Sequence, residues 1–414
     1  MGFLRLFLAH PYLIAFGVLS NACSSFGQTF FLSLFTPSLT EHFGLSMVEL
    51  GSYYAGVTLL SAILLSITGG WIDTVDARVF CVGVAVTLSG SALLLGFAEH
   101  LPLMLLGLFG VRFGGQGLFS HLAGTIISRS FSSKRGKALS LSSVGFPLGE
   151  AILPFVVVQV LMMVHWTTLW QIVGIGVFAL YVPVAVLLLT KATPEEEHRA
   201  PSSAKVEAVS HAKPIWTRKD VFQHPMVWML LPYTVISPFL LTGLFFHQAT
   251  ISNDFQFEPS VMAGAFVFFG LARGGSALCI GPLIDRYRAI RLLPFTLIPI
   301  GLGTLFMGLW TEPLTASIYL GLAGMSVGLS GPVRAAFYAE TFGTVHLGAI
   351  RSVFTTLAVF ATALSPPSMG YFLEHVGDSS TLFYSCAASV FVASMMAWFA
   401  AGRLGAAEQP PKIA

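Results

Sequence analysis

Charged residues are scarce in this sequence, since Asp, Glu, Lys and Arg together make up 10% of its 414 residues. Soluble domains usually carry about 25% charged residues, so no soluble domain of any size is expected. Hydrophobic residues, in contrast, make up 55% of the chain. This balance predicts a protein that lies within a membrane.

Cysteines and the motifs of enzymes are also few. The four cysteines have spacings that fit neither a zinc site nor a disulfide framework, and we interpret them as small core residues: Cys23, Cys81, Cys279 and Cys386. No ATP-binding Gly-x-x-x-x-Gly-Lys loop is present. No cluster of His and carboxylates lies at mid-depth for an intramembrane hydrolase. The sequence predicts neither an enzyme nor a cofactor or metal site, and its net charge of +2 predicts no nucleic-acid surface.

Twelve strongly apolar segments fill the chain, and each is long enough to cross a bilayer. A helical span takes about 20 apolar residues, because backbone amides in lipid must bond to one another. The predicted spans are 12–39, 47–72, 79–98, 101–128, 137–162, 167–190, 226–252, 260–284, 290–310, 313–338, 347–373 and 380–402. The predicted fold class is an all-α membrane protein with 12 transmembrane helices in two pseudo-symmetric six-helix bundles.

The charges between the spans predict the orientation. Basic residues stand in the even-numbered connections: Arg78, Arg129, Lys134, Arg135, Lys137, Arg286, Arg288 and Arg291. Acidic residues stand in the odd-numbered connections: Glu41, Glu99, Asp254, Glu258, Glu312, Glu374 and Asp378. The positive-inside rule then places both termini in the cytoplasm. The compact loops and the lack of a targeting extension are compatible with a monomeric, multi-pass protein of a bacterial inner membrane.

One polar segment interrupts the apolar pattern and divides the chain. It contains the acidic run Pro194–Glu197 and the basic stretch Lys213–Lys219. We predict an N-terminal bundle over 1–190, a cytoplasmic linker over 191–224 and a C-terminal bundle over 225–414. The linker is interpreted as a tether, with a regulatory binding site as the alternative.

The two halves carry matching markers. Gly69 and Asp73 follow the second span, and Gly281 and Asp285 follow the eighth. The two glycines are 212 residues apart, and so are the two aspartates. Phe131 and Phe342 mark the ends of the fourth and tenth spans and are 211 residues apart. Two independent markers with nearly the same offset indicate an internal repeat, and membrane proteins built from repeats are often transporters.

These residues make the chain similar to the major facilitator superfamily over nearly its whole length. The superfamily's signature between helices two and three is matched by Gly69, Asp73 and Arg78, whereas Thr74 and Asp76 depart from it. The second copy retains four matching residues: Gly281, Asp285, Arg286 and Arg291. The resemblance implies a cytoplasmic latch that holds one conformation of a transporter. The alternative is that Asp73 and Arg78 are solvated loop charges.

Three charged residues lie at mid-depth of the predicted spans: Arg112, Glu150 and Arg273. Each is costly in lipid, by at least ~2.5–3.5 kcal/mol, unless it is paired or wetted. Two Arg against one Glu leave an excess positive charge, which predicts a binding site for an anion. Arg334, Glu340 and Arg351 lie near the inner ends of their spans and are interpreted as structural.

Arg273 resembles the Arg by which the oxalate–formate and monocarboxylate branch of the superfamily holds a carboxylate. The segment Ala339–Gly343 also looks like that branch. Span eleven lacks the Lys of the oxalate exchanger and has Thr355 and Thr356 instead, so the resemblance favours a monocarboxylate over a dicarboxylate. An ion pair between Arg273 and Glu150 is the alternative interpretation.

Arg112 resembles the buried Arg of the superfamily's helix-four motif, although Gln116 follows one residue later than the usual spacing places it. Arg112 and Gln116 share one helix face, and Gln28 completes the candidate substrate-binding set with Arg273. A purely structural pairing of Arg112 with Glu150 is the alternative. Glu150 is the candidate proton carrier: it neutralises an Arg in the empty site and takes a proton when a substrate carboxylate displaces it.

The sequence as a whole predicts a secondary transporter that moves a small organic anion with H⁺ across the lipid bilayer. Two other readings stay open. Gly136, Gly145 and Gly149 follow the spacing of the helix-five motif of drug–proton antiporters, although Glu150 stands where that motif has Pro. The other alternative is a sensor that binds its ligand without transporting it.

Overall fold

The computed structural model describes residues 2–131, 134–192, 216, 218–343 and 346–406. All regular elements within these residues are helices, and the described chain contains no strand. Helices are expected in long apolar runs because they satisfy their backbone groups internally. The predicted all-α fold class is confirmed.

Eleven helices in the described chain are long and apolar enough to cross a membrane. A twelfth span results if the bent pair Phe3–Ala9 and Pro11–Gly27, which meet at 104°, is counted as one. The structure thus agrees with the predicted number of spans. The predicted cytoplasmic placement of both termini stays a prediction.

The chain divides into two compact units. Met1–Ser46 and Gly56–Val209 form the first unit, and Met47–Ala55 with Ser210–Ala414 form the second. Most of the predicted linker, residues 193–215 and 217, lies outside the described residues. The linker boundaries at 191 and 224 therefore stay a prediction.

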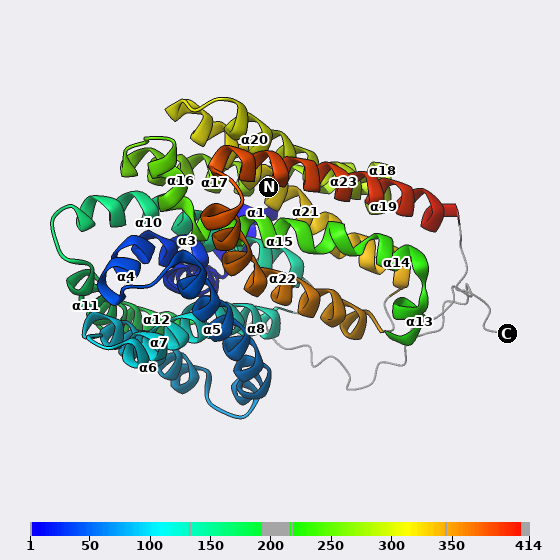
Figure 1. Cartoon of the computed structure of the whole chain (residues 1–414). Coiled ribbons are helices and arrows are strands. Elements are labelled where there is room, and N and C mark those ends of the chain that lie inside the picture. Colours follow the sequence, from blue (N-terminus) through cyan, green and yellow to red (C-terminus); the bar gives the residue numbers. More distant parts are fainter. Residues whose placement is uncertain (1, 132–133, 193–215, 217, 344–345, 407–414) are drawn as a thin grey trace. The chain divides into compact units, whose positions relative to one another are not determined.

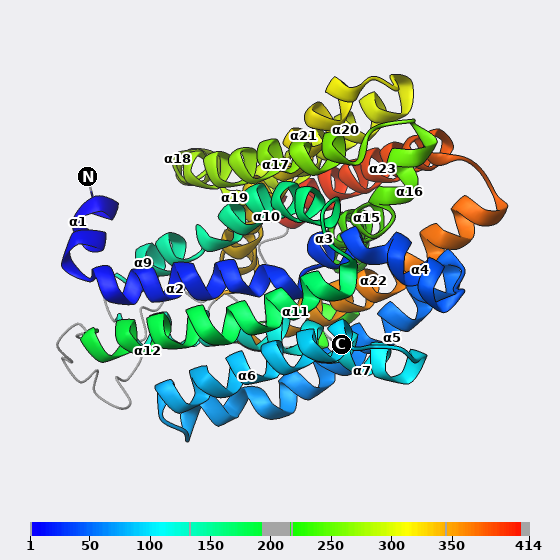
Figure 2. The same ribbon diagram turned by 90° about the vertical axis from the view of Figure 1, so that its left-hand side faces the viewer.

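The first unit contains the α-helices of the N-terminal half apart from Met47–Ala55, the first part of α5, and 3₁₀ or π-helical segments labelled η join some of them. Their bounds are α1 Gly2–Ala9, α2 Pro11–Cys23, η1 Ser24–Gly27, α3 Thr29–Leu32, η2 Ser33–Phe35, α4 Thr36–Phe43, α5 Met47–Thr68, η3 Gly69–Asp73, α6 Ala77–Gly96, α7 Leu101–Val111, η4 Arg112–Phe119, α8 Ser120–Ser130, α9 Arg135–Ser142, α10 Gly145–Leu161, α11 Trp166–Gly176, η5 Val177–Tyr181 and α12 Val182–Lys191. In this unit α6 packs against α7, α11 and α12, while α2 packs against α8 and α10 (Figures 1 and 2).

The second unit contains the remaining helices. Their bounds are α13 Arg218–Gln223, α14 Pro225–Met229, α15 Leu231–Phe246, α16 Gln248–Asp254, α17 Pro259–Cys279, α18 Gly281–Tyr287, α19 Ala289–Leu292, η6 Leu293–Leu297, α20 Ile298–Leu309, α21 Pro313–Phe342, α22 Leu347–His375 and α23 Ser379–Ala406. Here α21 packs along α17 and α20, α20 packs on α23, and α15 packs on α22 (Figure 1).

The first predicted span, 12–39, differs from the structure. It is interrupted at Gln28, whose ψ of 153° is extended and ends the run of α2 and η1. The chain then continues through α3 and η2 into α4, which has Pro37 in its first turn. Hydropathy follows apolar content alone, so it does not detect a break made of apolar and small polar residues.

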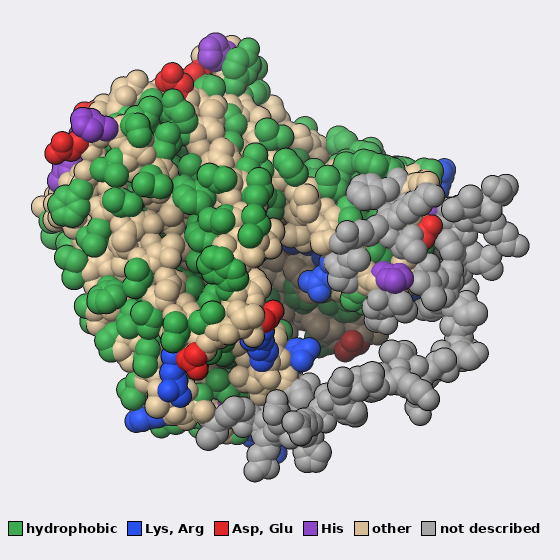
Figure 3. All heavy atoms as spheres, turned by 90° about the horizontal axis from the view of Figure 1, so that it is seen from below, with side chains coloured by type: hydrophobic (Ala, Val, Ile, Leu, Met, Phe, Trp, Pro, Cys, Tyr) green, Lys and Arg blue, Asp and Glu red, His purple; other side chains and the backbone are tan. Residues whose placement is uncertain are grey.

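Large apolar side chains cover much of the outer surface. Leu60, Ile63 and Ile67 recur at helical spacing along α5 and are each more than half exposed. On α23, Trp398 and Phe399 are equally exposed. Uncharged atoms cover most of the face drawn in Figure 3, and charged side chains on it are few. Such surfaces suit contact with lipid tails and would be a liability in water.

Candidate functional site

Arg112 is the most deeply buried cation of the described chain, with 1% of its surface exposed. It lies where α7 gives way to η4, in the middle of the fourth predicted span. One guanidinium nitrogen donates a hydrogen bond of 2.9 Å to the backbone oxygen of Gly27 in η1. A carbonyl of an interrupted helix thus helps to hold a charge inside the unit, as expected where irregular backbone is buried in protein.

The segment η4 is a π-helix, and it packs very closely on η1. A side chain at Gly27 would come within 2.4 Å of the Val111 oxygen and 2.5 Å of the Gln116 nitrogen, and one at Gly115 would meet the backbone of Gly27. A π-helix holds more residues per turn than an α-helix and is often found at functional sites. It gives a physical reason for the additional residue between Arg112 and Gln116.

Glu150 is the other charged side chain buried to less than a tenth exposure in the described chain, at 7%. It lies on α10, next to Gly149, where any side chain would meet the Ser25 hydroxyl at 2.1 Å. α10 therefore packs on the same segment, η1, whose Gly27 carbonyl accepts the bond from Arg112. The first unit brings the elements that carry Arg112 and Glu150 onto one common neighbour.

Gln28 and Gln116 both stand close to this junction. Gln28 directly follows η1 and is half-buried. Gln116 is also half-buried, and its backbone nitrogen is one of the atoms that approach Gly27. The first unit therefore collects Gln28, Arg112 and Gln116 around the η1 and η4 contact.

Arg273 belongs to the second unit and is half-buried on α17. Two small residues, Gly274 and Gly275, follow Arg273 in the sequence. The facing helix α21 approaches closely, since a side chain at Gly328 would come within 2.3 Å of the Arg273 oxygen. The tight α17 and α21 contact fixes the backbone from which the guanidinium projects.

The segment predicted to form the latch of the first unit contacts a residue that the sequence analysis did not assign to it. Asp73, at the end of η3, forms an ion pair with Arg129 in the last turn of α8. Arg129 also donates a hydrogen bond of 2.9 Å to the oxygen of Ile72. A single guanidinium thus binds both a carboxylate and a helix-end carbonyl, which its planar fork allows.

The other residues of the signature between helices two and three make separate contacts. The oxygen of Gly69 lies 2.8 Å from the imidazole Nε2 of His121. Arg78 is exposed at the start of α6. Asp76, which departs from the superfamily signature, caps α6: its carboxylate accepts the backbone N–H of Arg78 at 2.8 Å.

The corresponding segment of the second unit is organised differently. Gly281, Asp285, Arg286 and Arg291 are all exposed, and the Arg286 guanidinium lies 5.2 Å from the ring centre of Tyr287. The N-terminus of α19 is capped by Glu340 of α21, whose two carboxylate oxygens lie 3.2 and 3.1 Å from the nitrogen of Ala289. Glu340 also lies 4.0 Å from Arg288. The sequence classed Glu340 as structural without assigning this contact.

Arg129 and Glu340 are the two residues whose contacts with these motif segments the sequence analysis did not predict. One signal was available, because each stands two residues before the Phe that marks the internal repeat, Phe131 or Phe342. Residues at matching positions of two repeats are expected to meet matching segments. The repeat therefore pointed to both.

The described chain combines long apolar helices in two units with two buried charges in one unit and charge clusters at the helix ends. This combination is typical of one class of protein, the polytopic membrane transporters. Residues 17–264 match the Major Facilitator Superfamily. The chain belongs to this superfamily: it is an integral, multi-pass membrane transporter of a small molecule and not an enzyme.

Solved structures support the same fold. The chain is similar to the crystal structure of a bacterial homolog to the human lysosomal transporter Spinster in an inward-facing and unoccupied conformation, with a TM-score of 0.67 and 14% identity over 97% of this chain and 99% of that one. The occupied form of that homolog matches with a TM-score of 0.64 and 15% identity over 97% and 96%. No curated protein matches the chain significantly. At such identities the likeness establishes the fold alone, so the resemblance to the oxalate–formate and monocarboxylate branch stays a prediction.

Proposed function

We propose that this transporter moves a small organic anion, a monocarboxylate, together with a proton. The observation that carries the proposal is the burial of Arg112, a permanent cation with 1% of its surface exposed. A guanidinium stays protonated when it is removed from water, and it binds carboxylates through two parallel hydrogen bonds. A buried Arg in a membrane span is by default a functional residue.

Arg273 is proposed as a second contact for the anion. It is half-buried on α17, an apolar helix in which no Asp, Glu or Lys occurs. Its backbone is fixed by the close contact with Gly328, which favours a reproducible side-chain position. A guanidinium inside an apolar helix favours a substrate of negative charge.

Glu150 is proposed as the proton carrier. Burial favours the neutral form of a carboxylate, whereas a nearby guanidinium favours the charged form. α10 and η4 both pack on η1. A change in the contacts of Arg112 can therefore reach Glu150 through this one intervening segment. When a substrate carboxylate binds the guanidinium, Glu150 loses part of its stabilisation as an anion and takes up a proton.

The proposed test is uptake into proteoliposomes under an imposed pH gradient, with labelled monocarboxylates, dicarboxylates and cationic dyes. The variants are Arg273→Ala, Arg273→Lys and Glu150→Gln. Arg403→Ala is the matched control, because it removes one exposed Arg from the last turn of α23 in the same unit.

We expect gradient-driven uptake of a monocarboxylate by the wild type and by Arg403→Ala, and loss of uptake in Arg273→Ala. Glu150→Gln should retain exchange of the anion across the membrane while its rate no longer depends on pH. Transport of cationic dyes that is unaffected by Arg273→Ala would contradict the proposal. Normal proton coupling in Glu150→Gln would leave the anion part standing and remove Glu150 from the mechanism.

A drug–proton antiporter is the second candidate, and one observation favours it. Gly145 packs closely on α2 and Gly149 on η1. A side chain at Gly145 would come within 2.2 Å of the Val18 oxygen. The sequence linked these glycines to the helix-five motif of such antiporters. The dye arm of the same experiment separates the two candidates.

The Asp73 and Arg129 ion pair is proposed as the working part of the latch in the first unit. It joins η3 to the end of α8. Both side chains are about half exposed, at 60% and 48%, so the pair is weak enough to open during a transport cycle.

A further inference from the structure

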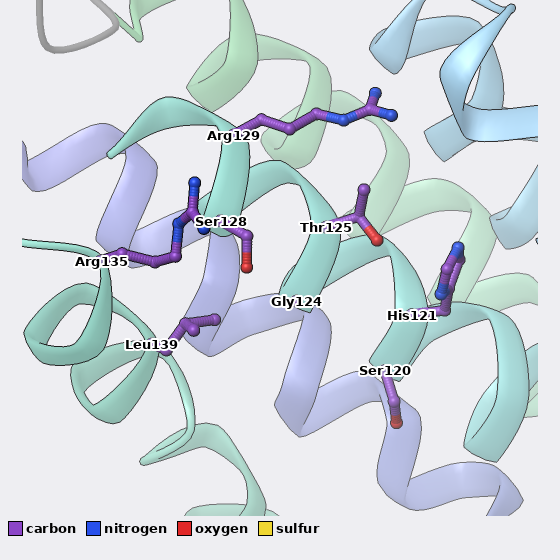
Figure 4. A pocket seen from close by; sticks show the side chains of 8 residues that line it. All are labelled: Ser120, His121, Gly124, Thr125, Ser128, Arg129, Arg135 and Leu139. Carbon is purple, nitrogen blue, oxygen red and sulfur yellow. The ribbon is translucent and has the colours of Figure 1, made fainter. Parts of the chain in front are cut away.

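An open cavity of about 480 Å³ lies on the first unit, and neither Arg112 nor Glu150 lines it. It is lined by Ser120, His121, Gly124, Thr125, Ser128, Arg129, Arg135 and Leu139 (Figure 4). Six of these residues lie on α8, and Arg135 and Leu139 project from α9 toward it. The cavity is large enough for a phosphate group and part of the molecule that carries it.

The spacing of the lining residues places several polar side chains along the wall of the cavity. Ser120, Gly124 and Ser128 recur every four residues and form one row along α8. Thr125 and Arg129 belong to the adjacent row, also four residues apart. Hydroxyl groups therefore project beside a guanidinium over two turns of one helix, and Gly124 leaves the middle of the wall open. A side chain built at Gly124 would meet nothing within 4 Å.

The charge of the cavity is positive. Arg129 and Arg135 contribute two guanidinium groups, and Asp73 is the carboxylate paired with Arg129. Arg135 makes a long hydrogen bond of 3.4 Å from its Nε to the Phe131 oxygen, and it has no carboxylate partner among the described residues. This leaves a net positive charge beside the Ser128 and Thr125 hydroxyls, which is the chemistry that recognises phosphate oxygens.

We propose that this cavity binds a phosphate-type oxyanion. Arg135 supplies the charge, and Ser128 with the neighbouring Thr125 supplies hydrogen bonds from α8. The oxyanion is either a free phosphate compound or the headgroup of an anionic lipid, because both present the same oxygens. The proposal is independent of the transported substrate, since none of its residues belongs to the Arg112, Glu150 and Arg273 set.

Binding has a consequence for the latch. An oxyanion in the cavity competes with Asp73 for the guanidinium of Arg129, which is itself a lining residue. Both side chains of this ion pair are about half exposed, so the pair resists such competition only weakly. Anion binding therefore loosens the link between η3 and α8. The cavity acts as a regulatory site that senses phosphate or anionic lipid.

The test uses the purified full-length protein in a neutral detergent and equilibrium binding of labelled inorganic phosphate at constant ionic strength. Arg135→Gln removes the charge, and Gly124→Leu fills the cavity without an initial clash. Gly136→Leu is the matched control, because Gly136 is also a helical glycine with nothing within 4 Å of a built side chain, and it does not line the cavity. A second arm measures the thermal unfolding midpoint in phosphatidylcholine vesicles with and without phosphatidylglycerol.

We expect saturable phosphate binding by the wild type and Gly136→Leu, with affinity lower by about tenfold or more in Arg135→Gln and Gly124→Leu. Asp73→Asn should bind about twofold to fivefold more tightly, because it removes the competitor for Arg129. If phosphate does not bind but phosphatidylglycerol raises the midpoint of the wild type and not of Gly124→Leu, the site takes the lipid headgroup. Equal behaviour of the wild type, Arg135→Gln and Gly124→Leu toward both probes would overturn the proposal.

Discussion

Arg129 and Glu340 occupy matching positions of the two halves, 211 residues apart, and carry opposite charges. Arg129 reaches the end of η3 and binds Asp73 and the Ile72 oxygen. Glu340 reaches the start of α19 and accepts the N–H of Ala289. Each residue ties the loop that follows a repeat's second helix to the same repeat's fourth helix, but with the donor and acceptor roles exchanged.

The exchange extends to the helix caps. In the first unit α6 is capped from within its own segment by Asp76. The matching position in the second unit is Arg288, which has a positive φ of 63° and provides no side-chain cap. Glu340 supplies the missing acceptor from another helix. The two halves therefore satisfy the same helix end by different routes, one local and one tertiary.

The two caps predict different responses to mutation. Asp76→Ala should speed amide exchange at the start of α6, and Glu340→Ala should do so at the start of α19. Loss of an N-cap costs about 1 kcal/mol, which corresponds to about fivefold faster exchange where exchange occurs by local opening. Hydrogen exchange followed by mass spectrometry measures both sites in one experiment.

Asp76→Asn and Glu340→Gln are the matched controls, because each retains an oxygen acceptor. They should exchange nearly as slowly as the wild type. Faster exchange at the start of α6 in Glu340→Ala would contradict the assignment of one cap to each unit.

The sequence was sufficient for the fold class and for the internal repeat, because hydropathy and a fixed offset are properties of the chain alone. It was not sufficient for the break at Gln28, since Ser24–Gly27 are compatible with a helix and only the contact with η4 shows why the chain turns there. Motif matching led to Arg78, which is exposed, and missed Arg129, because the partner of Asp73 lies more than 50 residues away on another helix.

Gly27 is expected to tolerate no side chain. In Gly27→Ala the new methyl group would lie 2.4 Å from the Val111 oxygen and 2.5 Å from the Gln116 nitrogen, and neither backbone atom can move away easily. Overpacking of this kind costs about 1–3 kcal/mol. The variant should show a lower thermal midpoint and a smaller monodisperse fraction in size-exclusion chromatography.

Gly90→Ala on α6 is the control for that substitution, because a side chain there meets nothing within 4 Å. Alanine in a helix is more stable than glycine by about 0.5–1 kcal/mol, so this variant should be as stable as the wild type or slightly more stable. Equal stability of Gly27→Ala and Gly90→Ala would show that η1 and η4 are not packed as described.

The Asp73 and Arg129 pair should give a small coupling energy. The two side chains are 60% and 48% exposed, and exposed ion pairs contribute about 0.2–1 kcal/mol. A double-mutant cycle of Asp73→Asn and Arg129→Gln, followed by chemical unfolding, measures this coupling. It should decrease as salt is added, because salt screens exposed charges. Strictly additive effects at low salt would mean that Arg129 acts through Ile72 alone.

Asp378, which lies outside the membrane-spanning segments, is expected to make the thermal stability of the protein depend on pH. It lies just before α23 and accepts the backbone N–H of Thr381 at 2.9 Å, and the hydrogen bonds from Thr381 lower the pKa of the Asp378 carboxyl below its usual 3.8. A lowered pKa means that the folded state favours the charged carboxylate, so this stabilisation is present above pH 3.8 and is lost as the pH falls through the folded value. Asp378→Asn keeps a neutral cap. The wild type should therefore have the higher thermal midpoint at pH 6, and the difference should shrink toward zero as the pH falls below 3.8. A difference that stays constant down to pH 3 would show that the charge of Asp378 does not contribute to the cap.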